Sequence, residues 1–418
     1  MNKKQLLKFA EDIVVCKHKE KVILGNTKNG YTFKLSDECF SILQEYEKAE
    51  ITIEEFLSYF EDVGDKNYFE SILELLQMNH ILVSENSDEH AEFEVTIKLT
   101  NRCNLQCRHC CVSAGPCIEA EELTTDEWKA VLDQLAELNI IGLVFSGGEP
   151  LIRKDLLELA EYAKKNVTTH LGLMSNATLI TEELAPKLVD LFESFSFSID
   201  GVSEESVSPI RGKGTFTATM RGIELMKKYH MGNYSLSFTI VKQNEKYQDE
   251  FYEFATKLGA TPMKRALSIV GRAKENLDLI PDEDRYALHA TFSVEKNRKY
   301  YPDEMPRCIS CGAFERKFLI SEIGEVYPCP ALEINEFALG NVREISNIGQ
   351  FFLQKDYKST KGYAFFRKMH PAYREKCKGC PVKLYCESCV ADFYEIMQKN
   401  TYEHFCEEKR YYLEHVWE

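Results

Sequence analysis

Apolar residues recur along the middle of the chain with two alternating periods, which predict a regular series of strands and helices. A spacing of two residues is typical of strands, and a spacing of three to four is typical of helices. Strands are expected at residues 93–99, 143–145, 171–174, 195–199, 236–241 and 266–270. Helices are expected between them, from about Asp126 with Thr125 as the cap, and at 156–164, 182–192, 217–229 and 249–258. This alternation predicts an α/β fold with a parallel sheet, in which ligands bind at the carboxyl ends of the strands.

The first 88 residues show a different pattern, which predicts a small separate domain. Three short strand signals lie near residues 13–15, 22–24 and 31–35. Three helices should follow: one capped by Ser36, one opened by the capping box Thr52-x-x-Glu55, and one that runs from Phe69 to Met78. The polar, acidic stretch 84–91 is expected to be a linker.

Composition and charge narrow the classes of protein that fit. The chain has 418 residues, 44% of them hydrophobic, which is enough for two or three domains with ordinary cores. Its net charge of −16 argues against a general nucleic-acid binder, which needs basic surface to meet phosphates. No apolar h-region opens the sequence and no 18-residue apolar run occurs. We therefore expect a cytoplasmic protein without a nucleic-acid or membrane partner.

The chain contains 15 cysteines, and their spacing favours metal binding. Twelve lie in two regions, 103–117 and 308–389, and Cys406 follows shortly after. Only Cys16 and Cys39 lie well outside these regions. Short C-x2-C intervals are typical of metal sites in a reducing compartment rather than of disulfides.

Three cysteines follow the first expected strand of the middle region: Cys103, Cys107 and Cys110, spaced C-x3-C-x2-C. Three thiolates on one loop can hold three irons of a [4Fe–4S] cluster and leave the fourth iron open to another ligand. A zinc knuckle is the alternative, and its fourth ligand would be His109, Cys111 or Cys117. Cys111 and Cys117 are otherwise expected to be small buried residues, and the alternative is that one of them lies near the substrate.

This loop resembles the cysteine loop of the radical S-adenosylmethionine (SAM) enzymes. The resemblance implies a partial (β/α)6 barrel, and a cluster that binds SAM and cleaves it to a 5′-deoxyadenosyl radical. The second strand ends in Ser146-Gly147-Gly148-Glu149-Pro150, which matches the family's GGEP motif. By the same resemblance, the candidates for holding SAM are Gly147, Gly148, Glu149, Asn176, Ser198, Arg211 and His109, which replaces the family's aromatic residue before the third cysteine. Asn176, Ser198 and Arg211 could equally be polar residues that cap strands or helices.

The C-terminal cysteines resemble the SPASM extension, which carries two auxiliary [4Fe–4S] clusters. The resemblance assigns Cys308, Cys311, Cys329 and Cys389 to one cluster, and Cys377, Cys380, Cys386 and Cys406 to the other. Two residues, Glu387 and Ser388, stand where the family has three, so the loop before Cys389 is shorter. A pair of structural zinc ribbons is the alternative, because four cysteines suit zinc as well as iron–sulfur.

The order of three strands and three helices in residues 1–88 resembles the PqqD-like domain, which recognises the leader of a ribosomally made peptide. The alternative is a generic winged-helix domain. The resemblances together imply three domains: 1–88 for leader recognition, 89–295 for the radical SAM barrel and 296–418 for SPASM. In such domains the leader adds a strand to an open sheet edge.

These resemblances together imply a radical SAM enzyme that installs an intramolecular cross-link in a precursor peptide. The favoured product is a cysteine thioether to carbon, as made by sactipeptide and ranthipeptide synthases, and the first alternative is a carbon–carbon cross-link. The expected cofactors are SAM and three [4Fe–4S] clusters, with a flavodoxin or ferredoxin as electron donor. The alternative from another class is a non-enzymatic iron–sulfur or zinc-binding adaptor. The sequence assigns no catalytic acid or base.

Overall fold

The computed structural model describes residues 2–83, 92–117, 121–281, 307–386, 389–398 and 402–417. The chain divides into two compact units. One comprises residues 1–90, 285–312 and 365–418, and the other comprises 91–284 and 313–364. We call the first the terminal unit and the second the barrel unit. The linker expected at 84–91 and the domain boundary expected near residue 295 lie outside the described residues.

The barrel unit is built on a nine-stranded sheet in the order β12-β11-β10-β4-β5-β6-β7-β8-β9. Strands β4 to β9 are parallel and each pairs with its successor in sequence. Their bounds are β4 Glu92–Lys98, β5 Asn139–Ser146, β6 Leu171–Ser175, β7 Ser194–Ser198, β8 Asn233–Ile240 and β9 Thr261–Ala266. The predicted α/β class with six parallel strands and intervening helices is confirmed.

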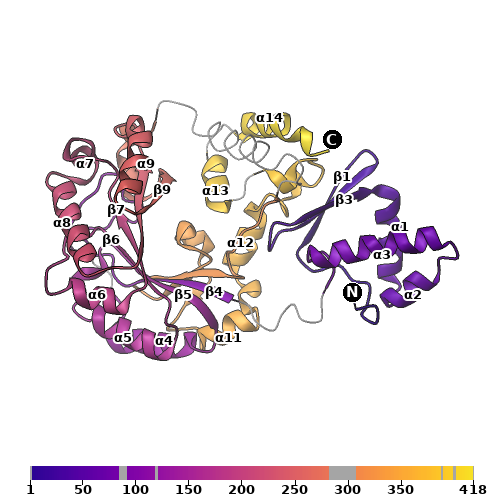
Figure 1. Cartoon of the computed structure of the whole chain (residues 1–418), viewed down its shortest axis with the longest axis horizontal. Coiled ribbons are helices and arrows are strands. Elements are labelled where there is room, and N and C mark those ends of the chain that lie inside the picture. Colours follow the sequence, from indigo (N-terminus) through magenta and orange to yellow (C-terminus); the bar gives the residue numbers. More distant parts are fainter. Residues whose placement is uncertain are drawn as a thin grey trace. The chain divides into compact units, whose positions relative to one another are not determined.

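Helices cover one face of this curved sheet (Figure 1). They are α4 Thr125–Leu135, α5 Leu156–Asn166, α6 Ala185–Leu191, α7 Glu204–Arg211, α8 Thr215–Lys228 and α9 Gln248–Lys257. Helix α4 begins one residue earlier than predicted, because Thr124 rather than Thr125 accepts the bond from the Glu127 amide. The pattern missed α7, whose turn depends on a capping box at Ser203 and tolerates Pro209 within it.

The last parallel strand lies earlier than the sequence predicted. We expected it at 266–270, whereas β9 spans Thr261–Ala266 and pairs with β8 over its whole length. None of its residues is fully buried, so it lacks the apolar alternation that marks a half-buried strand. Main-chain pairing at the sheet edge, rather than side-chain burial, sets its position.

The two faces of the parallel strands have opposite chemistry. Phe145, Phe195 and Phe197 are buried on the helix side, where the ring of Phe145 meets that of Phe192 at the end of α6. Because side chains alternate along a strand, the residues between them lie on the concave side. That side carries small polar groups at matching register positions: Thr96, Ser146, Ser196, Ser198, Ser235 and Ser237. The concave face is therefore a hydroxyl-rich surface.

Three strands from late in the sequence extend the sheet beyond β4, which the periodicity did not predict. Strand β10 (Lys317–Ile320) pairs parallel with β4, and β11 (Glu325–Tyr327) and β12 (Gly340–Asn341) continue antiparallel. Helix α11 (Ile348–Leu353) lies on the outer face, where Phe352 stacks on Phe318 at 3.9 Å between ring centroids. The first barrel strand is consequently an interior strand.

The terminal unit begins with an antiparallel sheet in the order β1-β2-β3. Its elements are β1 Ile13–His18, β2 Lys21–Asn26, β3 Thr32–Ser36, α1 Asp37–Lys48, α2 Ile53–Ser58 and α3 Val63–Met78. The predicted caps are confirmed: Ser36 accepts from the Cys39 amide, and Thr52 forms the capping box with Glu55. One core of this unit joins β2 to the three helices through Leu24, Phe40, Phe56 and Leu73, among others.

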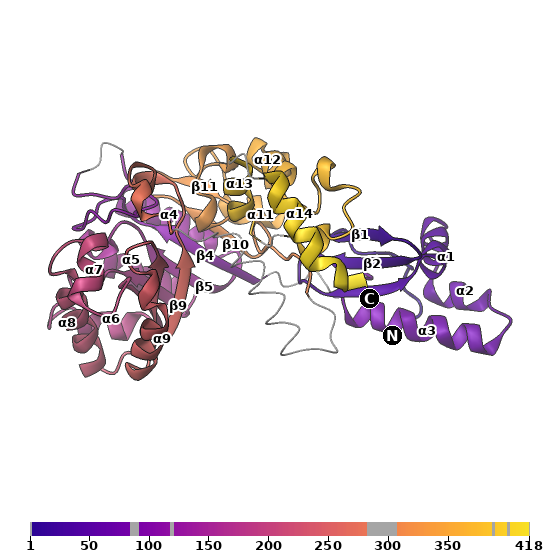
Figure 2. The same ribbon diagram turned by 90° about the horizontal axis from the view of Figure 1, so that it is seen from above.

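A second core of the terminal unit joins this sheet to the C-terminal segment. Val14, Cys16 and Ile23 are buried together with Cys308, Ala372, Leu384, Val416 and Trp417. Figure 2 shows β1 and β2 side by side near the C-terminus. The indole N–H of Trp417 donates to the Pro381 carbonyl at 2.8 Å, and Lys21 Nζ donates to the Trp417 carbonyl at 2.7 Å. Helices α13 (Val390–Gln398) and α14 (Tyr402–Leu413) belong to this unit, and α12 (Lys361–Met369) includes residues of both units.

Candidate active site

The cysteine loop follows β4 directly, so it lies at the carboxyl end of the parallel strands. Cys103 and Cys107 are buried and Cys110 is partly buried. The Cys103 amide donates to the Gly115 carbonyl at 2.8 Å, which closes the loop on itself. The loop is thus held in the position where α/β barrels bind their ligands.

A short 3₁₀ helix at Gly271–Glu275 clamps this loop, and the sequence did not point to it. Arg272 donates from Nη1 to the Cys107 carbonyl at 2.8 Å, and its amide donates to the Cys110 carbonyl at 2.9 Å. Gly271 has a φ of +55°, and a Cβ there would lie 2.3 Å from the Cys111 carbonyl. The only sequence signal was a Gly-Arg pair, which the misplaced last strand obscured.

Each of the three thiols receives an N–H donor. The Leu105 amide lies 3.4 Å from Cys103 Sγ, Arg211 Nη1 lies 3.8 Å from Cys107 Sγ, and the Ala114 amide lies 3.3 Å from Cys110 Sγ. Burial raises the pKa of the Cys103 thiol to about 11, whereas N–H donors favour the thiolate.

Such donors also stabilise the sulfurs of iron–sulfur clusters, so the loop fits the cluster that the sequence predicts. Among the described residues, no three Cys, His, Asp or Glu side chains are gathered in metal-ligating geometry. The fit therefore rests on the loop and on the donors that face its sulfurs.

The Gly-Gly-Glu-Pro turn after β5 packs directly on the cysteine loop. The Gly148 amide donates to the Thr100 carbonyl at 2.8 Å, and the Glu149 amide donates to the Arg102 carbonyl at 2.9 Å. A Cβ on Gly148 would lie 2.5 Å from the Arg102 carbonyl oxygen. The approach of the two backbones accounts for glycine at this position.

Glu149 is fully buried and ties the ends of two strands together. Its carboxylate accepts hydrogen bonds from the Ser175 hydroxyl at 2.9 Å, from the backbone N–H of Asn176 at 2.8 Å and from the backbone N–H of Leu151 at 3.1 Å. Burial raises the pKa of this carboxyl to about 7, although the three donors favour its ionised form. The side chain acts on the site by fixing Asn176.

Asn176 and Ser198 both lie at strand ends beside the cysteine loop. The side-chain Nδ2 of Asn176 lies 3.0 Å from Asn104 Oδ1 and 3.9 Å from Cys103 Sγ. Ser198 is the last residue of β7 and lies on the concave side, in register with Ser237. The structure therefore gathers these two predicted residues at the same edge of the sheet.

Asp200 contacts the other two candidates, His109 and Arg211. The sequence analysis did not single Asp200 out. The carboxylate is fully buried, and its Oδ2 lies 2.8 Å from His109 Nε2 and 2.6 Å from Arg211 Nε. Burial alone raises the pKa of Asp200, but Arg211 and His109 outweigh burial and hold the pKa well below its usual range. Asp200 has a φ of +59°, and Asp-Gly after a strand was the available signal.

Asp200 contacts and orients His109 and Arg211, two of the side chains that the resemblance assigned to SAM. Arg211 also faces Cys107, and His109 Nδ1 is buried without a hydrogen-bond partner among the described residues. His109 is thus oriented through Nε2.

The expectation that Cys111 and Cys117 are buried is wrong, because both are exposed. Cys111 is accessible to water, yet the surrounding protein raises the pKa of its thiol to about 11.

One of the two predicted auxiliary cysteine sets lies within the terminal unit. The pKa of the Cys377 thiol is raised by burial and further by Cys380 and Cys406, and Cys386 packs with Cys406 against Phe393. The four cysteines of this set therefore lie close to one another: Cys377, Cys380, Cys386 and Cys406.

In the other predicted set, Cys308, Cys311 and Cys389 belong to the terminal unit and Cys329 belongs to the barrel unit. Cys308 lies in the apolar second core, where burial raises the pKa of its thiol to about 12. Its Sγ lies 3.5 Å from the Asn26 carbonyl. The shortened loop at Glu387 and Ser388 lies outside the described residues, so this second set stays a prediction.

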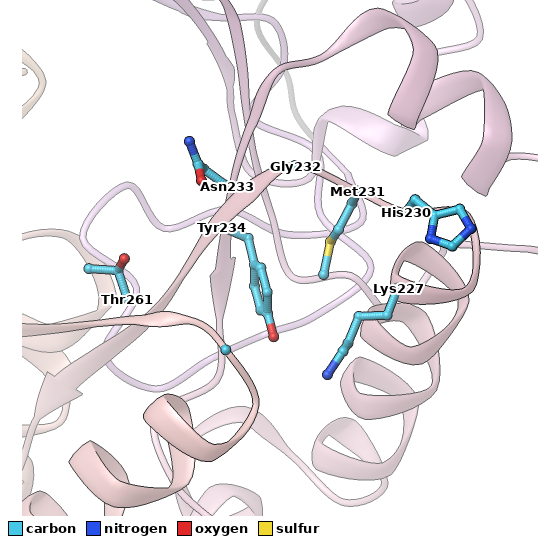
Figure 3. Close-up of a pocket in the computed structure, with 8 residues that line it drawn as sticks. Lys227, His230, Met231, Gly232, Asn233, Tyr234 and Thr261 are labelled. Carbon is cyan, nitrogen blue, oxygen red and sulfur yellow. The ribbon is translucent and has the colours of Figure 1, made fainter.

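A hollow of about 440 Å³ lies at the opposite end of the strands (Figure 3). Asn233 and Thr261, the first residues of β8 and β9, line it together with Tyr234, His230 and Lys227. Chemistry in α/β barrels takes place at the carboxyl ends of strands, so this hollow is not a candidate active site.

No helix in the described residues is long and apolar enough to cross a membrane.

Comparison with known families finds two matching models. One, described as the radical SAM superfamily, matches residues 97–255, and the other, the SPASM iron–sulfur cluster-binding domain, matches residues 297–381. The matched segments contain the cysteine loop, the glycine turn and five of the C-terminal cysteines: Cys308, Cys311, Cys329, Cys377 and Cys380.

Two kinds of curated protein are similar to this chain. It is 30% identical over 265 residues to the mycofactocin maturase MftC of Mycolicibacterium smegmatis, covering 59% of this chain and 67% of that protein. It is 30% identical over 332 residues to the AdoMet-dependent heme synthase of Oleidesulfovibrio alaskensis, covering 68% and 81%.

Among solved structures, Streptococcus suis SuiB bound to S-adenosylmethionine matches with a TM-score of 0.56 and 16% identity, covering 94% of this chain and 97% of SuiB. SuiB bound to the precursor peptide SuiA also has a TM-score of 0.56, at 15% identity. These structural matches show a shared fold.

Proposed function

The chain belongs to the radical SAM superfamily and carries a SPASM domain, and on this premise we propose that it cross-links a ribosomally synthesised precursor peptide. The favoured product is a thioether between a cysteine sulfur and a carbon of the same peptide. A carbon–carbon cross-link is the alternative on the same scaffold. SAM and iron–sulfur clusters are its cofactors, and three clusters are proposed.

The observation that carries this proposal is the cysteine loop at the end of β4, with an N–H donor at each thiol and the glycine turn packed on it. Cys103, Cys107 and Cys110 would hold the cluster and leave one iron for SAM. With both bound, the site supplies a radical that abstracts hydrogen from the peptide. The Gly147-Gly148 backbone would face the SAM amino group.

Asp200 determines how the remaining residues would meet SAM. It holds Arg211 against Cys107 and fixes His109 through Nε2, so the unpartnered Nδ1 of His109 is available to the adenosyl group. Asn176, fixed by Glu149, and Ser198 would contact the ribose or the carboxylate. The roles of His109, Arg211 and Asn176 are therefore assigned to side chains whose orientation other residues already determine.

A peptide suits the concave face better than a tetrapyrrole does. The hydroxyls of Ser196, Ser198, Ser235 and Ser237 can exchange hydrogen bonds with peptide backbone groups. A flat macrocycle would need broad apolar walls, and the phenylalanines of these strands face the helices instead. A heme-forming activity is the second candidate, because the heme synthase relative is as similar in sequence as the maturase.

We further propose that residues 1–88 recognise the leader of the precursor, with 89–295 as the barrel and 296–418 as the SPASM domain. Strand β3 is the edge of its sheet. Backbone hydrogen bonds join Asn26 to Tyr31 and Asp37 to Glu20. Because hydrogen-bonded and non-hydrogen-bonded pairs alternate along antiparallel strands, Ile23 and Lys34 form a non-hydrogen-bonded pair. The N–H of Lys34 therefore points to the open edge, where a leader strand would pair.

This placement allows a test on the full chain. Lys34→Pro removes one outward N–H while the bonds to β2 remain, so leader binding should weaken and SAM cleavage should persist. Lys34→Ala keeps the N–H and is the matched control. Equal leader affinity of the two variants would contradict recognition at this edge.

The two auxiliary cysteine sets would hold clusters that accept the electron released when the cross-link forms. These sets are Cys308, Cys311, Cys329 and Cys389, and Cys377, Cys380, Cys386 and Cys406. A flavodoxin or ferredoxin would reduce the SAM-binding cluster. Cys386→Ala changes the second of these sets, whose four cysteines lie close to one another. It should reduce cross-linking more than it reduces the formation of 5′-deoxyadenosine.

The decisive experiment incubates the anaerobically reconstituted protein with SAM, a reductant and a small cysteine-containing peptide encoded beside its gene. The expected result is 5′-deoxyadenosine together with a peptide that has lost two hydrogens and one free thiol. Conversion of an iron-porphyrin in place of the peptide would favour the heme-forming candidate. Absence of SAM cleavage would overturn both.

A further inference from the structure

A buried charged cluster lies on the concave side of the barrel unit, beside the proposed site. Lys98 is the last residue of β4 and is paired with Ser146, the residue before the glycine turn. Its Nζ lies 2.5 Å from Glu333 Oε1 and 3.0 Å from Glu322 Oε2. Lys98 is only 5% exposed, so the cluster is largely removed from water.

The charges in this cluster do not balance. One ammonium faces two carboxylates, which leaves one negative charge in a desolvated position when all three groups are ionised. Burial lowers the pKa of Lys98, but the two carboxylates outweigh burial and raise it, so the ammonium is retained. The pKa of Glu333 is raised by burial, lowered by Lys98 and raised again by Glu322. One added proton would make the cluster neutral.

Glu333 is the more exposed of the two carboxylates in the cluster. Its side chain is 19% exposed, compared with 10% for Glu322. Glu333 acts through space on the thiol of Cys111 in the cysteine loop and on Tyr327, where its effect exceeds that of Glu322. Burial raises the pKa of Tyr327 to about 12, so this neighbour is neutral near pH 7. The partly exposed carboxylate of Glu333 is therefore the accessible base.

We propose that Glu333 accepts a proton from the precursor peptide during cross-linking, and that Lys98 and Glu322 position it and set the pH at which it acts. This inference rests on the proposed function. The S–H bond of the peptide cysteine breaks, its electron pair stays on sulfur, and an O–H bond forms on Glu333. The peptide then holds a thiolate for bond formation, and the cluster of Lys98, Glu322 and Glu333 has no net charge.

Two matched substitutions separate proton acceptance from charge and shape. Glu333→Gln and Glu322→Gln each remove one negative charge and retain a hydrogen-bond acceptor for Lys98. Glu333→Gln should lower the ratio of cross-link to 5′-deoxyadenosine on the order of 10²-fold, the usual contribution of a general base. Glu322→Gln should retain cross-linking but move the acid limb of its pH profile to lower pH, because Glu322 raises the pKa of Glu333.

A control on the same hairpin is Glu325→Gln, whose carboxylate accepts from Asn341 outside the cluster. It should leave the ratio unchanged. If Glu333→Gln and Glu322→Gln lower the ratio equally, the cluster acts only through its charge and the proposal is overturned. A Glu333→Gln ratio equal to that of the wild type also overturns it.

Infrared titration of the peptide-free holoenzyme gives a readout that does not depend on turnover. The carboxylic acid band that appears as the pH falls should lose one component in Glu333→Gln. In Glu322→Gln that component should remain but appear at lower pH. Its persistence in Glu333→Gln would show that another group takes up the proton. A wild type that cleaves SAM but cross-links no precursor overturns the proposed function instead.

Discussion

Replacing Asp200 by Asn tests whether the buried carboxylate organises the SAM end of the site. The substitution retains the shape of the side chain, and Asn tolerates the left-handed backbone conformation found there. It removes the negative charge that Arg211 Nε meets at 2.6 Å, with both side chains almost wholly buried. The guanidinium is then left without a counter-ion.

The expected cost follows from this burial. Removing one partner of a buried ion pair typically destabilises a protein by about 3–5 kcal/mol. For a unit the size of the barrel unit, this corresponds to a fall in Tm of roughly 6–20 °C. SAM affinity should fall as well, because His109 and Arg211 both lose the group that orients them.

Asp278→Asn is the matched control, because it is the same substitution near the same loop. Asp278 accepts two bonds from Arg108, at 2.6 and 2.8 Å, but both side chains are largely open to water. Its Tm should stay close to that of the wild type, because an exposed ion pair contributes little.

The pH dependence gives an independent check of the sign. The folded pKa of Asp200 lies below its unfolded value of about 3.9, so its stabilisation is present above that value and is lost as the pH falls further. The difference in Tm between wild type and Asp200→Asn should therefore be constant near neutral pH and narrow below about pH 4. Thermal unfolding followed by circular dichroism measures it. An Asp200→Asn protein as stable as wild type at pH 7 would refute the reasoning.

Three further predictions concern the loop, the turn and the charged cluster. Replacing all three loop cysteines by Ala should remove one cluster's worth of iron and abolish SAM cleavage, measured by iron analysis and 5′-deoxyadenosine; surviving cleavage would contradict the assignment. Gly148→Ala should weaken SAM binding in equilibrium dialysis, because its Cβ would meet a carbonyl oxygen at 2.5 Å, whereas Gly142→Ala meets nothing nearer than 3.9 Å and should bind normally. Lys98→Met should destabilise the protein by about 3 kcal/mol at pH 7 because Glu322 and Glu333 lose their cation. Burial already raises the pKa of Glu333 and Lys98 lowers it, so without Lys98 this pKa rises further and the stability of the variant should recover as the pH falls; a loss that deepens in acid would contradict this account.

The sequence predicted the local elements because local rules dominate them. Apolar alternation and capping boxes placed most of the parallel strands and the helices between them, and the Thr52–Glu55 capping box is present as expected. The last strand was misplaced because β9 is held by backbone pairing at an edge, where side chains carry little pattern. Helix α7 was missed because its signals are a Ser cap and an interior proline, which read as a turn.

For the site, the sequence by itself determined the chemistry and the tertiary structure decided the environment. Cysteine spacing and the glycine turn carried the resemblance to the family, because these residues stand at fixed intervals along the chain. The charges that act on the site are distant in sequence: Asp200 meets His109 from another strand end, and Lys98 meets Glu333 across 235 positions. No local pattern encodes such contacts. They arise only when parallel strands bring their carboxyl ends together and exclude water, which makes an unbalanced charge costly enough to matter.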